Sequence, residues 1–543
     1  MASSSAVTRT PSDSLVRRLK IGFGVVALLL GAIEAWVGRF FMANDGIQYM
    51  DNAAVYWRGD FHNALNTLWS PLYPWLFGVL NAILRPVRER QFPLIHLLNF
   101  FLFAMTLAAF LFFLRSVRPL LPDRSEPGFI LLSGAAFLYC SLEYTALVIV
   151  TPDLLVNFFA FVAAGLLVRI ARAEARTRDF ALLGATLGLG YLGKAPFLPI
   201  GVLCLLMAAS FGRKRALMAC AIFVVIVGPY IFALSEAKGR LTWGDSAWLN
   251  LAFHVNGLPH VNWQGEPEGA GRPIHPTHQI SMHPSVFEFA TPIPGTYPPW
   301  YDPAYWNQGV RITHSPRAFA AAIREQIRSY AVWLHRQLPL LFAFLALFLL
   351  ADKRQAFARL KILWPVLAMG AMPFAMYAPV YAEPRYLAPF FVLLWAALFA
   401  CVVEERRTAL AIGAAAAILM MLEPLGLLYT IPSFLPRARL HYEIAHDLEA
   451  MGLKPGDQVG LVHDGLFYYW AYLAGARVTL EVYFSQNPSD RDAEWSTARQ
   501  ILASQAANFL VSPRLDGVTD QPGWRRLGTT GVFAYPIRAA GAN

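Results

Sequence analysis

The sequence predicts a polytopic α-helical membrane protein that carries a small α/β domain at its C-terminal end. Of its 543 residues, 56% are hydrophobic and only 15% are charged, whereas roughly a quarter of the residues are charged in an average soluble protein. Long apolar runs recur along the chain, and only helices and closed barrels satisfy their backbone groups in lipid. The runs are too long and too unbroken for barrel strands, so we expect helices.

About eleven membrane-spanning helices are expected from these runs, with the N-terminus in the cytoplasm. They lie near residues 21–43, 92–114, 127–148, 153–170, 180–193, 196–211, 215–235, 331–350, 362–381, 386–403 and 408–430. The chain then divides into a cytoplasmic tail (1–20), a membrane domain (21–435) and an extracytoplasmic domain (436–543). Two long loops of the membrane domain, 44–91 and 236–330, face outward together with this last domain.

The net charge of +10 is carried by short basic clusters between the apolar runs. Examples are RRLK at 17–20, RIARAEARTR at 169–178 and RKR at 213–215. Lys and Arg that flank membrane spans mark the cytoplasmic side, so the basic charge indicates topology, and no nucleic-acid partner is expected. The four cysteines lie within apolar runs, so no disulfide framework is predicted for Cys140, Cys204, Cys220 and Cys401.

The segment PLYPWLFGVLNAIL (71–84) is apolar but short for a membrane span. Counting it as a crossing would place the basic cluster at 169–178 outside. We therefore expect an interfacial helix on the outer surface, with Arg85, Arg88 and Arg90 at the lipid headgroups.

The chain beyond residue 436 has the pattern of a small α/β domain. A helix (HYEIAHDLEAMG), a KPGD turn and the apolar strand QVGLVH come first. The strands RVTLEVYF and NFLVSP alternate with helical segments, and WRRLGTTGVFAYPI is typical of a closing hairpin. This alternation predicts a largely parallel sheet, with a scaffolding or acceptor-docking role as the expected function.

Three acids follow the first span in the segment NDGIQYMDNAAVYWRGD. Asp45, Tyr49 and Ala53 are spaced by four residues, which places them on one face of a helix. An acid at the membrane surface indicates a functional site, although an amphipathic helix lying in the interface has the same alternation. Asp51 faces away from this stripe and is expected to be solvated, and Asp60 is expected to shape the turn that ends the segment.

Two further charged residues are expected on the same side of the membrane. Asp153 follows Thr151-Pro152 at an outer turn between two spans, where either Thr151 or Asp153 could cap the next helix. Alternatively, Asp153 belongs to a site at the membrane interface. Lys194 interrupts an apolar hairpin in GYLGKAPFLP (190–199), where it is either a snorkelling side chain or a cation that binds a phosphate.

A third outer turn, YAEPRYLAP (381–389), presents Glu383, Arg385 and Tyr386. Arg385 could bind a phosphate through two parallel hydrogen bonds, which a lysine cannot form. It could equally pair with Glu383 and have no further role.

The second outer loop contains His275, His278 and His283 in HPTHQISMHP. Their spacing matches no standard zinc signature, and Pro276 and Pro284 interrupt regular structure. No metal site is therefore predicted there.

Taken in order, the outer-surface motifs resemble those of the C-type (GT-C) glycosyltransferases, which are polytopic enzymes that use lipid-linked sugars. The similarity is greatest to the branch of protein O-mannosyltransferases and bacterial aminoarabinose transferases. The motifs that carry it are Asp45 with Tyr49, Ala53 and Gly59-Asp60, then SPLYPWL (70–76), TPDL (151–154), YLGKAPFLP (191–199) and PRYLAP (384–389). The loop 236–330 and the tail lie outside the family pattern.

The resemblance implies an enzyme that transfers a sugar from a polyprenyl-phosphate carrier to a cell-envelope acceptor, which is a lipid, a polysaccharide or a protein. It implies that Asp45 is the catalytic base, that Asp153 is a second catalytic acid of the outer cavity, and that Lys194 and Arg385 bind the donor phosphate. The substrate cavity would be lined by Tyr49, Glu383 and Tyr386. The reaction would occur at the outer face of a bacterial inner membrane, in contact with membrane lipid.

The residue types suit this chemistry. A base removes the proton of the acceptor hydroxyl, and cations stabilise the leaving phosphate as its charge grows. One acid and a pair of cations are therefore sufficient for an inverting displacement. No cofactor is predicted with certainty, and a role for a divalent cation is left open.

Two other functional classes compete with the enzyme. A transporter or flippase of a lipid-linked glycan would be expected to contain internal repeats and acids near mid-membrane, and neither is evident in the sequence. A non-catalytic scaffold of the same fold would keep its function after Asp45→Asn.

Overall fold

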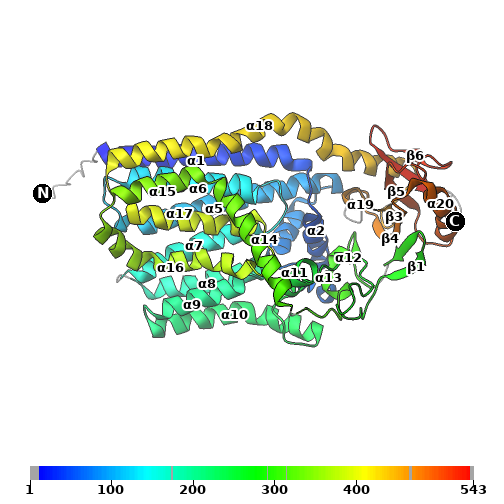
Figure 1. The fold of residues 1–543 in the computed structure, drawn as a ribbon, viewed down its shortest axis with the longest axis horizontal. Coiled ribbons are helices and arrows are strands. Elements are labelled where there is room, and N and C mark those ends of the chain that lie inside the picture. Colours follow the sequence, from blue (N-terminus) through cyan, green and yellow to red (C-terminus); the bar gives the residue numbers. More distant parts are fainter. Residues whose placement is uncertain (1–10, 173–174, 290–291, 314, 464–467, 538–543) are drawn as a thin grey trace.

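The computed structural model describes residues 11–172, 175–289, 292–313, 315–463 and 468–537. It consists of a bundle of long helices that run side by side, with a mixed sheet at one end, and the two chain ends lie at opposite ends of the molecule (Figure 1). The part of the bundle next to the sheet carries the short helices of the two outer loops. The expected fold class, a polytopic helical membrane protein with a small C-terminal α/β region, is confirmed.

Among the described residues, eight helices are long and apolar enough to cross a membrane. They are α1 (Pro11–Val37), α5 (Gln91–Val117), α6 (Glu126–Tyr139, continued by a π-helical turn at Cys140–Thr145), α7 (Asp153–Ala171), α10 (Arg213–Lys238), α16 (Lys353–Tyr377), α17 (Pro384–Val402) and α18 (Arg406–Ala450). A ninth would be α14 (Pro316–His335) with α15 (Leu338–Leu350), which are bent by 74° against each other.

The remaining expected spans also form helices, but shorter ones. They are α8 (Thr177–Gly193) and α9 (Phe197–Ala209), which the break at Lys194 separates. Every segment expected to span is therefore helical, while the number expected, about eleven, is not confirmed: eight helices in the described ranges, or nine with the bent pair, are long enough for a full crossing.

Glycines bring neighbouring helices into close contact, as is common in membrane proteins. A Cβ atom at Gly128 of α6 would lie 2.7 Å from backbone and side-chain atoms of Ala409 in α18. At Gly184 of α8 it would lie 2.2 Å from the carbonyl oxygen of Ala219 in α10. Larger residues at these positions would force the helix pairs apart.

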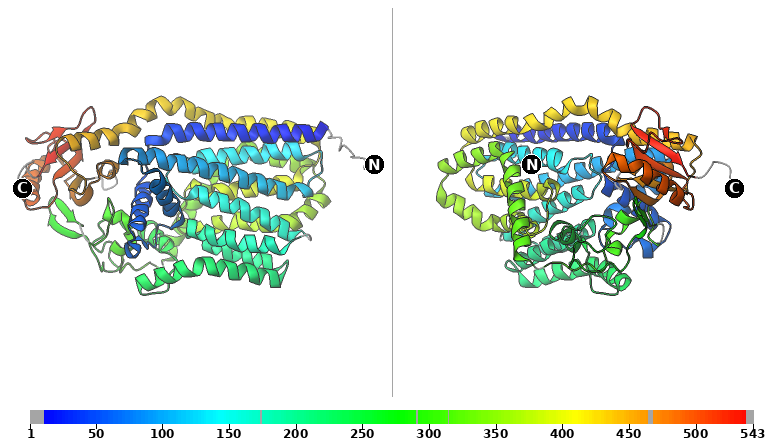
Figure 2. Two further views of the ribbon diagram at one scale, coloured as in Figure 1. Left: turned by 180° about the vertical axis from the view of Figure 1, so that it is seen from behind. Right: turned by 45° about the vertical axis from the view of Figure 1, so that its right-hand side comes forward.

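Three short helices of the first outer loop lie at the end of the bundle nearest the sheet. They are α2 (Asn44–Trp57), α3 (Phe61–Ala64) and α4 (Leu72–Leu84). The blue helices of this region run across the bundle axis in the rear view (Figure 2, left), and α4 packs against α2. The helix expected at 71–84 is thus present. Arg85 and Arg90 are exposed, but Arg88 donates a hydrogen bond to the carbonyl oxygen of Tyr472 at 3.0 Å, so it contacts the tail rather than lying only at headgroups.

The sheet has seven strands in the order β1-β2-β4-β3-β5-β7-β6. Its central strands β4, β3 and β5 are parallel, as expected, and the outer pairs are antiparallel. The strands are β1 (His278–Met282), β2 (Ser285–Glu288), β3 (Gln458–Val462), β4 (Arg477–Tyr483), β5 (Phe509–Pro513), β6 (Arg525–Arg526) and β7 (Val532–Pro536). Helices α19 (Tyr469–Ala474) and α20 (Pro488–Leu502) connect them.

The sheet unites two distant parts of the sequence. Strands β1 and β2 belong to the second outer loop, and β2 pairs with β4 of the tail. The segment HPTHQISMHP, which resembles a loop in sequence, therefore forms part of a hairpin. The boundary expected at 435/436 falls inside α18, which continues from the bundle to Ala450. The tail is thus built into the molecule at both points rather than appended to it.

Candidate active site

Four charged residues meet at the end of the bundle nearest the sheet, each at a helix end or a helix break. Asp45 lies in the first turn of α2, Asp153 begins α7, and Arg385 lies in the first turn of α17. Lys194 ends α8 in extended backbone, two residues before Pro196. Prolines 152, 196 and 384 end or start these helices because proline cannot donate in a helix interior.

These residues form one network of ion pairs, as expected from their common side of the membrane. Arg385 donates to Glu383 at 2.8 and 3.1 Å and to the Oδ2 atom of Asp45 at 3.2 Å. The third guanidinium nitrogen, Nη1, lies 3.5 Å from Oδ2 of Asp153. The ammonium of Lys194 pairs with the other oxygen of Asp153. The pairing of Arg385 with Glu383 is thus one part of a larger cluster.

The two aspartates of the network differ in their access to solvent. The side chain of Asp45 is 25% exposed, whereas that of Asp153 is 1% exposed. Asp153 accepts a hydrogen bond from the Thr151 hydroxyl at 2.8 Å. Neither Thr151 nor Asp153 makes a side-chain hydrogen bond that caps α7, so the capping interpretation is wrong. Asp153 is more deeply buried than Lys194 and Arg385 and forms an ion pair with each of them.

Tyr386 packs over the two cations. The Lys194 ammonium lies 4.1 Å from the centroid of the Tyr386 ring, and the Arg385 guanidinium carbon lies 5.2 Å from it. The negative face of an aromatic ring attracts cations at such distances. Lys194 is therefore held by an acid on one side and by a ring on the other, and the snorkelling interpretation is wrong.

A cavity of about 410 Å³ opens beside this network. Its charged part consists of Asp45, Lys194, Glu383 and Arg385, and its remaining walls are largely aromatic and aliphatic. These walls include Tyr49, Trp69, Trp243, Phe253, His254, His260, Trp300, Met376, Tyr377, Val380, Tyr381 and Tyr386. A charged cluster at one side of an apolar cavity suits a ligand that has an anionic group and an apolar portion.

Several cavity residues come from the second outer loop and were not predicted from the sequence. Trp300 donates from its indole N–H to Asp45 at 3.3 Å. His254, in α11 (Ser246–His254), stacks on Tyr381 with ring centroids 4.0 Å apart, and burial lowers the pKa of His254 to about 4. The sequence of the loop did not reveal which of its rings reach the site.

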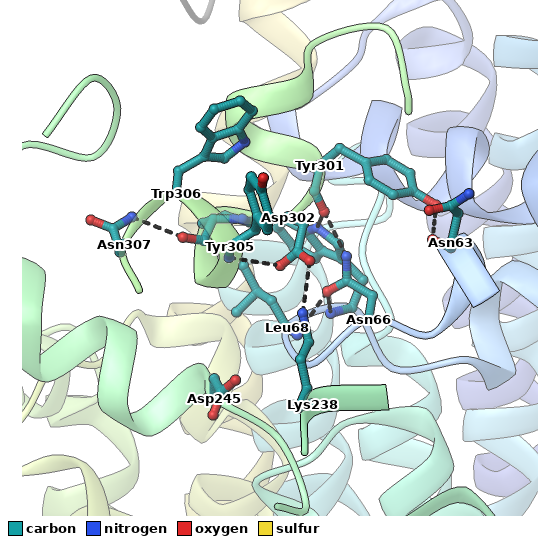
Figure 3. A network of polar contacts seen from close by, with 12 residues as sticks. Asn63, Asn66, Leu68, Lys238, Asp245, Tyr301, Asp302, Tyr305, Trp306 and Asn307 are labelled. Atoms are coloured by element: carbon teal, nitrogen blue, oxygen red, sulfur yellow. Dashed lines mark hydrogen bonds and ion pairs between the residues drawn. The ribbon is translucent and has the colours of Figure 1, made fainter. Parts of the chain in front are cut away.

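A polar network fastens this loop to the bundle (Figure 3). Lys238 at the end of α10 pairs with Asp302 at 3.0 Å. Asn66 donates to the carbonyl oxygen of Tyr301 at 2.6 Å, and the Tyr301 hydroxyl donates to the carbonyl oxygen of Asn63 at 3.0 Å. These contacts hold α12 (Pro298–Tyr301) and α13 (Pro303–Trp306) against the first outer loop, and so place Trp300 beside Asp45.

Asp51 is buried, which corrects the expectation that it is solvated. Its carboxylate accepts hydrogen bonds from the backbone N–H of Thr296 at 2.7 Å and from the Thr296 hydroxyl at 3.1 Å. Burial raises the pKa of Asp51 to about 6 despite these hydrogen bonds. Asp60 accepts from the backbone N–H of Asn63 and caps α3, as expected of a residue that shapes this turn.

The tail contacts α2 directly. Gln48 donates to the Tyr468 hydroxyl at 2.5 Å, which in turn donates to the carbonyl oxygen of Asn44 at 3.1 Å. Tyr468 stacks on Tyr297, whose hydroxyl donates to Glu481 of β4 at 2.7 Å. The helix that carries Asp45 is therefore held in place by both the second outer loop and the tail.

The histidines of the second outer loop have separate neighbours. His275 stacks on Tyr305, with ring centroids 4.2 Å apart, and His278 lies 3.4 Å from Glu288 across the β1–β2 hairpin. Within the described ranges, no group of three or more His, Cys, Asp or Glu side chains is arranged to hold a metal ion.

The fold and the network together define a polytopic membrane protein with the fold of the C-type glycosyltransferases. Two solved structures of ArnT from Cupriavidus metallidurans share it across nearly the whole chain. The structure bound to undecaprenyl phosphate aligns with a TM-score of 0.57 at 11% identity, covering 96% of this chain and 98% of ArnT. The apo structure aligns with a TM-score of 0.50 at 13% identity, covering 96% and 99%. No protein-family model matches the sequence, and a search of curated proteins finds no match.

Proposed function

We propose that this protein is a glycosyltransferase that takes a sugar from a polyprenyl-phosphate carrier and transfers it to a cell-envelope acceptor. The observation that carries the proposal is the placement of two cations, Lys194 and Arg385, next to the partly exposed carboxylate of Asp45 on one cavity. The similarity in fold to a protein that binds undecaprenyl phosphate supports the choice of donor.

The roles follow from what each side chain can reach. Asp45 accepts the proton of the acceptor hydroxyl as that oxygen bonds to C1 of the sugar. The bond between C1 and the phosphate oxygen breaks at the same time, and the polyprenyl phosphate leaves with the electron pair. Lys194 and Arg385 stabilise the second negative charge that develops on the phosphate. Attack opposite the leaving group inverts C1.

Asp153 takes a different role from the catalytic one that the sequence suggested. Because it is buried behind both cations, it cannot meet an acceptor, and we assign it as a positioning residue for Lys194 and Arg385. Tyr49, Glu383 and Tyr386 line the cavity, where Glu383 orients the guanidinium and Tyr386 covers the ammonium.

The aromatic walls of the cavity suit the sugar and the first part of the lipid chain. The site would face outward from a bacterial inner membrane, with the N-terminus in the cytoplasm and the tail outside. A flippase of the same glycan would move the lipid without breaking the bond at C1, and a scaffold would bind without turnover. Asp45 lies on the cavity surface, 3.2 Å from Arg385. A base beside a cation is what the transfer reaction needs, so this pair favours the enzyme over the flippase and the scaffold.

The test uses the purified full-length protein in lipid nanodiscs with undecaprenyl-phosphate sugars that carry aminoarabinose or a hexose. Release of undecaprenyl phosphate in the presence of acceptor lipids is measured for the wild type, Asp45→Asn and Lys194→Ala. Asp60→Asn is the matched control, because it changes an acid of the same segment at a helix cap where asparagine serves equally well.

We expect Asp45→Asn to lower turnover by about 100-fold or more while donor binding is kept, and Lys194→Ala to weaken donor binding. Asp60→Asn should behave as the wild type does. Full turnover by Asp45→Asn would contradict the assigned base, and absence of release from every donor by the wild type would contradict the enzyme itself.

A further inference from the structure

A second charged cavity lies at the opposite end of the bundle from the site. Its volume is about 490 Å³, and it is lined by five arginines, one carboxylate, a phenylalanine and a serine. These residues are Arg115, Arg169, Arg172, Arg176, Arg178, Asp179, Phe112 and Ser116. Helix α7 begins at Asp153 and is 19 residues long, which separates the two cavities by about 28 Å at 1.5 Å per residue. This distance is close to the thickness of the hydrocarbon core of a bilayer.

The arginines come from three neighbouring helices, with Arg172 directly after α7 and Arg176 directly before α8. Arg115 lies in the last turn of α5, Arg169 near the end of α7, and Arg178 in the first turn of α8. Phe112 packs over Gly165 of α7, where a Cβ atom would lie 2.6 Å from its ring. This close contact brings the end of α5 to the end of α7 and gathers their arginines around one space.

Among the described residues that line the cavity, the one carboxylate is already engaged. Asp179 is buried and pairs with Arg169 at 2.9 Å, and it also accepts a hydrogen bond from the backbone N–H of Arg176 at 3.0 Å. The lining residues therefore carry a large excess of positive charge. The N-terminal end of α8 adds the positive end of its dipole. Guanidinium groups that converge in this way bind phosphate oxygens through paired hydrogen bonds.

The helix surfaces that lead to this cavity are apolar and at least partly exposed. On α5, Phe101, Met105 and Ala108 are exposed on the helix face that continues to Phe112 and Arg115. On α7, the partly exposed side chains Phe158 and Val162 share a face with Arg169. In both helices, the spacing of these residues places them on one helix face.

On α8, Leu182 is 53% exposed and lies one turn after Arg178 on the same face. Each of the three helices thus presents an apolar stripe that ends at an arginine of the cavity. This arrangement matches a ligand with a charged head and apolar chains.

We propose that the arginine cavity binds the phosphate headgroup of an anionic membrane lipid, and specifically a lipid with two phosphates, in the leaflet opposite the candidate active site. The guanidinium groups would bind the phosphates, and the acyl chains would lie along the stripes of α5, α7 and α8. Basic pockets between membrane helices on the cytoplasmic side are suited to such headgroups. The site is separate from the proposed glycosyl transfer and does not depend on it.

A simpler account is that these arginines only orient the chain in the membrane, as basic residues near spans do. The two accounts differ in whether the geometry of the guanidinium group matters. Orientation needs positive charge alone, whereas paired hydrogen bonds to phosphate need guanidinium groups. Variants that exchange Arg for Lys therefore distinguish them.

The test measures lipid binding by native mass spectrometry of the delipidated full-length protein. The ligands are tetraoleoyl cardiolipin, dioleoyl phosphatidylcholine and inorganic diphosphate. The variants are a triple Arg115→Gln/Arg176→Gln/Arg178→Gln, the corresponding triple Arg→Lys, and Lys214→Gln as a matched control. Lys214 is exposed at the start of α10 and does not line the cavity.

We expect the wild type and Lys214→Gln to bind cardiolipin and not phosphatidylcholine. The Gln triple should bind cardiolipin about 100-fold more weakly, and the Lys triple should also bind more weakly than the wild type. Equal cardiolipin binding by the wild type and the Gln triple would overturn the site. Equal binding by the wild type and the Lys triple would show that positive charge alone attracts the lipid, without paired hydrogen bonds. Diphosphate binding as tight as cardiolipin binding would assign the cavity to a soluble phosphate and overturn the lipid.

Discussion

The three carboxylates around Arg385 show how the surroundings of an acid determine what it can do. Asp45 is 25% exposed on the cavity, Glu383 is 35% exposed beside it, and Asp153 is 1% exposed behind the cations. Only an acid that reaches the cavity can accept a proton from a substrate. A buried acid between two cations instead offsets their repulsion and holds them in one geometry.

The buried pair of Asp153 and Lys194 gives the first prediction. Asp153→Ala leaves Lys194 and Arg385 side by side without their shared carboxylate, and loss of one partner of a buried ion pair costs about 3–5 kcal/mol. We expect a clear drop in the thermal midpoint of the purified protein, while Asp123→Ala, at an exposed position, should leave it unchanged.

The double variant Asp153→Leu/Lys194→Met removes both charges and should recover most of the stability, since an apolar replacement of a buried pair is often tolerated. This double variant should bind the donor more weakly than the wild type does. Donor affinity equal to that of the wild type would contradict the role of Lys194 at the phosphate.

The second prediction concerns pH and Asp51. Its pKa is raised from 3.8 to about 6 by burial, so the folded protein binds this proton more tightly than the unfolded chain does. The contribution of Asp51 to the free energy of unfolding therefore falls by about 3 kcal/mol as the pH rises from about 4 to about 6, and is constant above that. Asp51→Asn cannot titrate.

The thermal midpoint of Asp51→Asn relative to the wild type should therefore rise between pH 4 and pH 6. Other titrating groups are common to both proteins and cancel in the difference. A difference that stays constant over this range would mean that the carboxyl of Asp51 keeps its ordinary pKa.

At the scale of elements, helix α2 holds the candidate base where its neighbours place it. The helix packs tightly at Gly46, where a Cβ atom would lie 2.8 Å from the Cβ atom of Val150. Gln48 and Asp51 bind Tyr468 and Thr296 on its other sides. The position of Asp45 therefore depends on three separate segments of the chain.

Gly46→Ala gives the third prediction. The added methyl group must push α2 away from Val150, which costs about 1–3 kcal/mol, and displacement of a catalytic group by a fraction of an ångström to 1 Å lowers kcat by about 10- to 100-fold. The measurement is turnover together with donor binding. Gly22→Ala on α1 is the control, because no atom lies within 4 Å of its added Cβ. Unchanged kcat in Gly46→Ala would show that α2 tolerates displacement.

The elements that sequence could predict are those with a local signal. Short windows of sequence contain the signals for three of them: the apolar runs, the Pro and Gly breaks around Asp153 and Lys194, and the alternating strands of the tail. The candidate site followed from them because the breaks fall at one end of the bundle. The pairing of β2 with β4 and the contact of Asp51 with Thr296 join residues far apart in the chain, and nothing near Asp51 in sequence identifies its partner.

At the scale of the molecule, the tail and the second outer loop form one structural unit with the site. They share a sheet, and both contact α2. This arrangement leads to a fourth prediction. A chain truncated after Gly452 lacks the strands that pair with the β1–β2 hairpin, so the loop 236–330 should become sensitive to limited proteolysis and turnover should be lost.

If the tail served only to dock the acceptor, the truncated protein would still bind the donor as tightly as the full chain and its loop would stay resistant. The two outcomes are separated by measuring donor binding and the proteolysis pattern on the same preparation. A circular dichroism spectrum checks that the helices of the bundle remain.

The shared sheet also has a consequence for when the protein becomes active during its synthesis. Tyr297 and its partner Glu481 are 184 residues apart, and at the usual elongation rates the ribosome needs about 10–40 s to make that length. The bundle helices that bear Lys194 and Arg385 are made before the tail, so α2 lacks its contacts with Tyr468 until the tail has been synthesised. An unfinished or prematurely ended chain would thus occupy the membrane with Asp45 held by fewer contacts than in the complete chain.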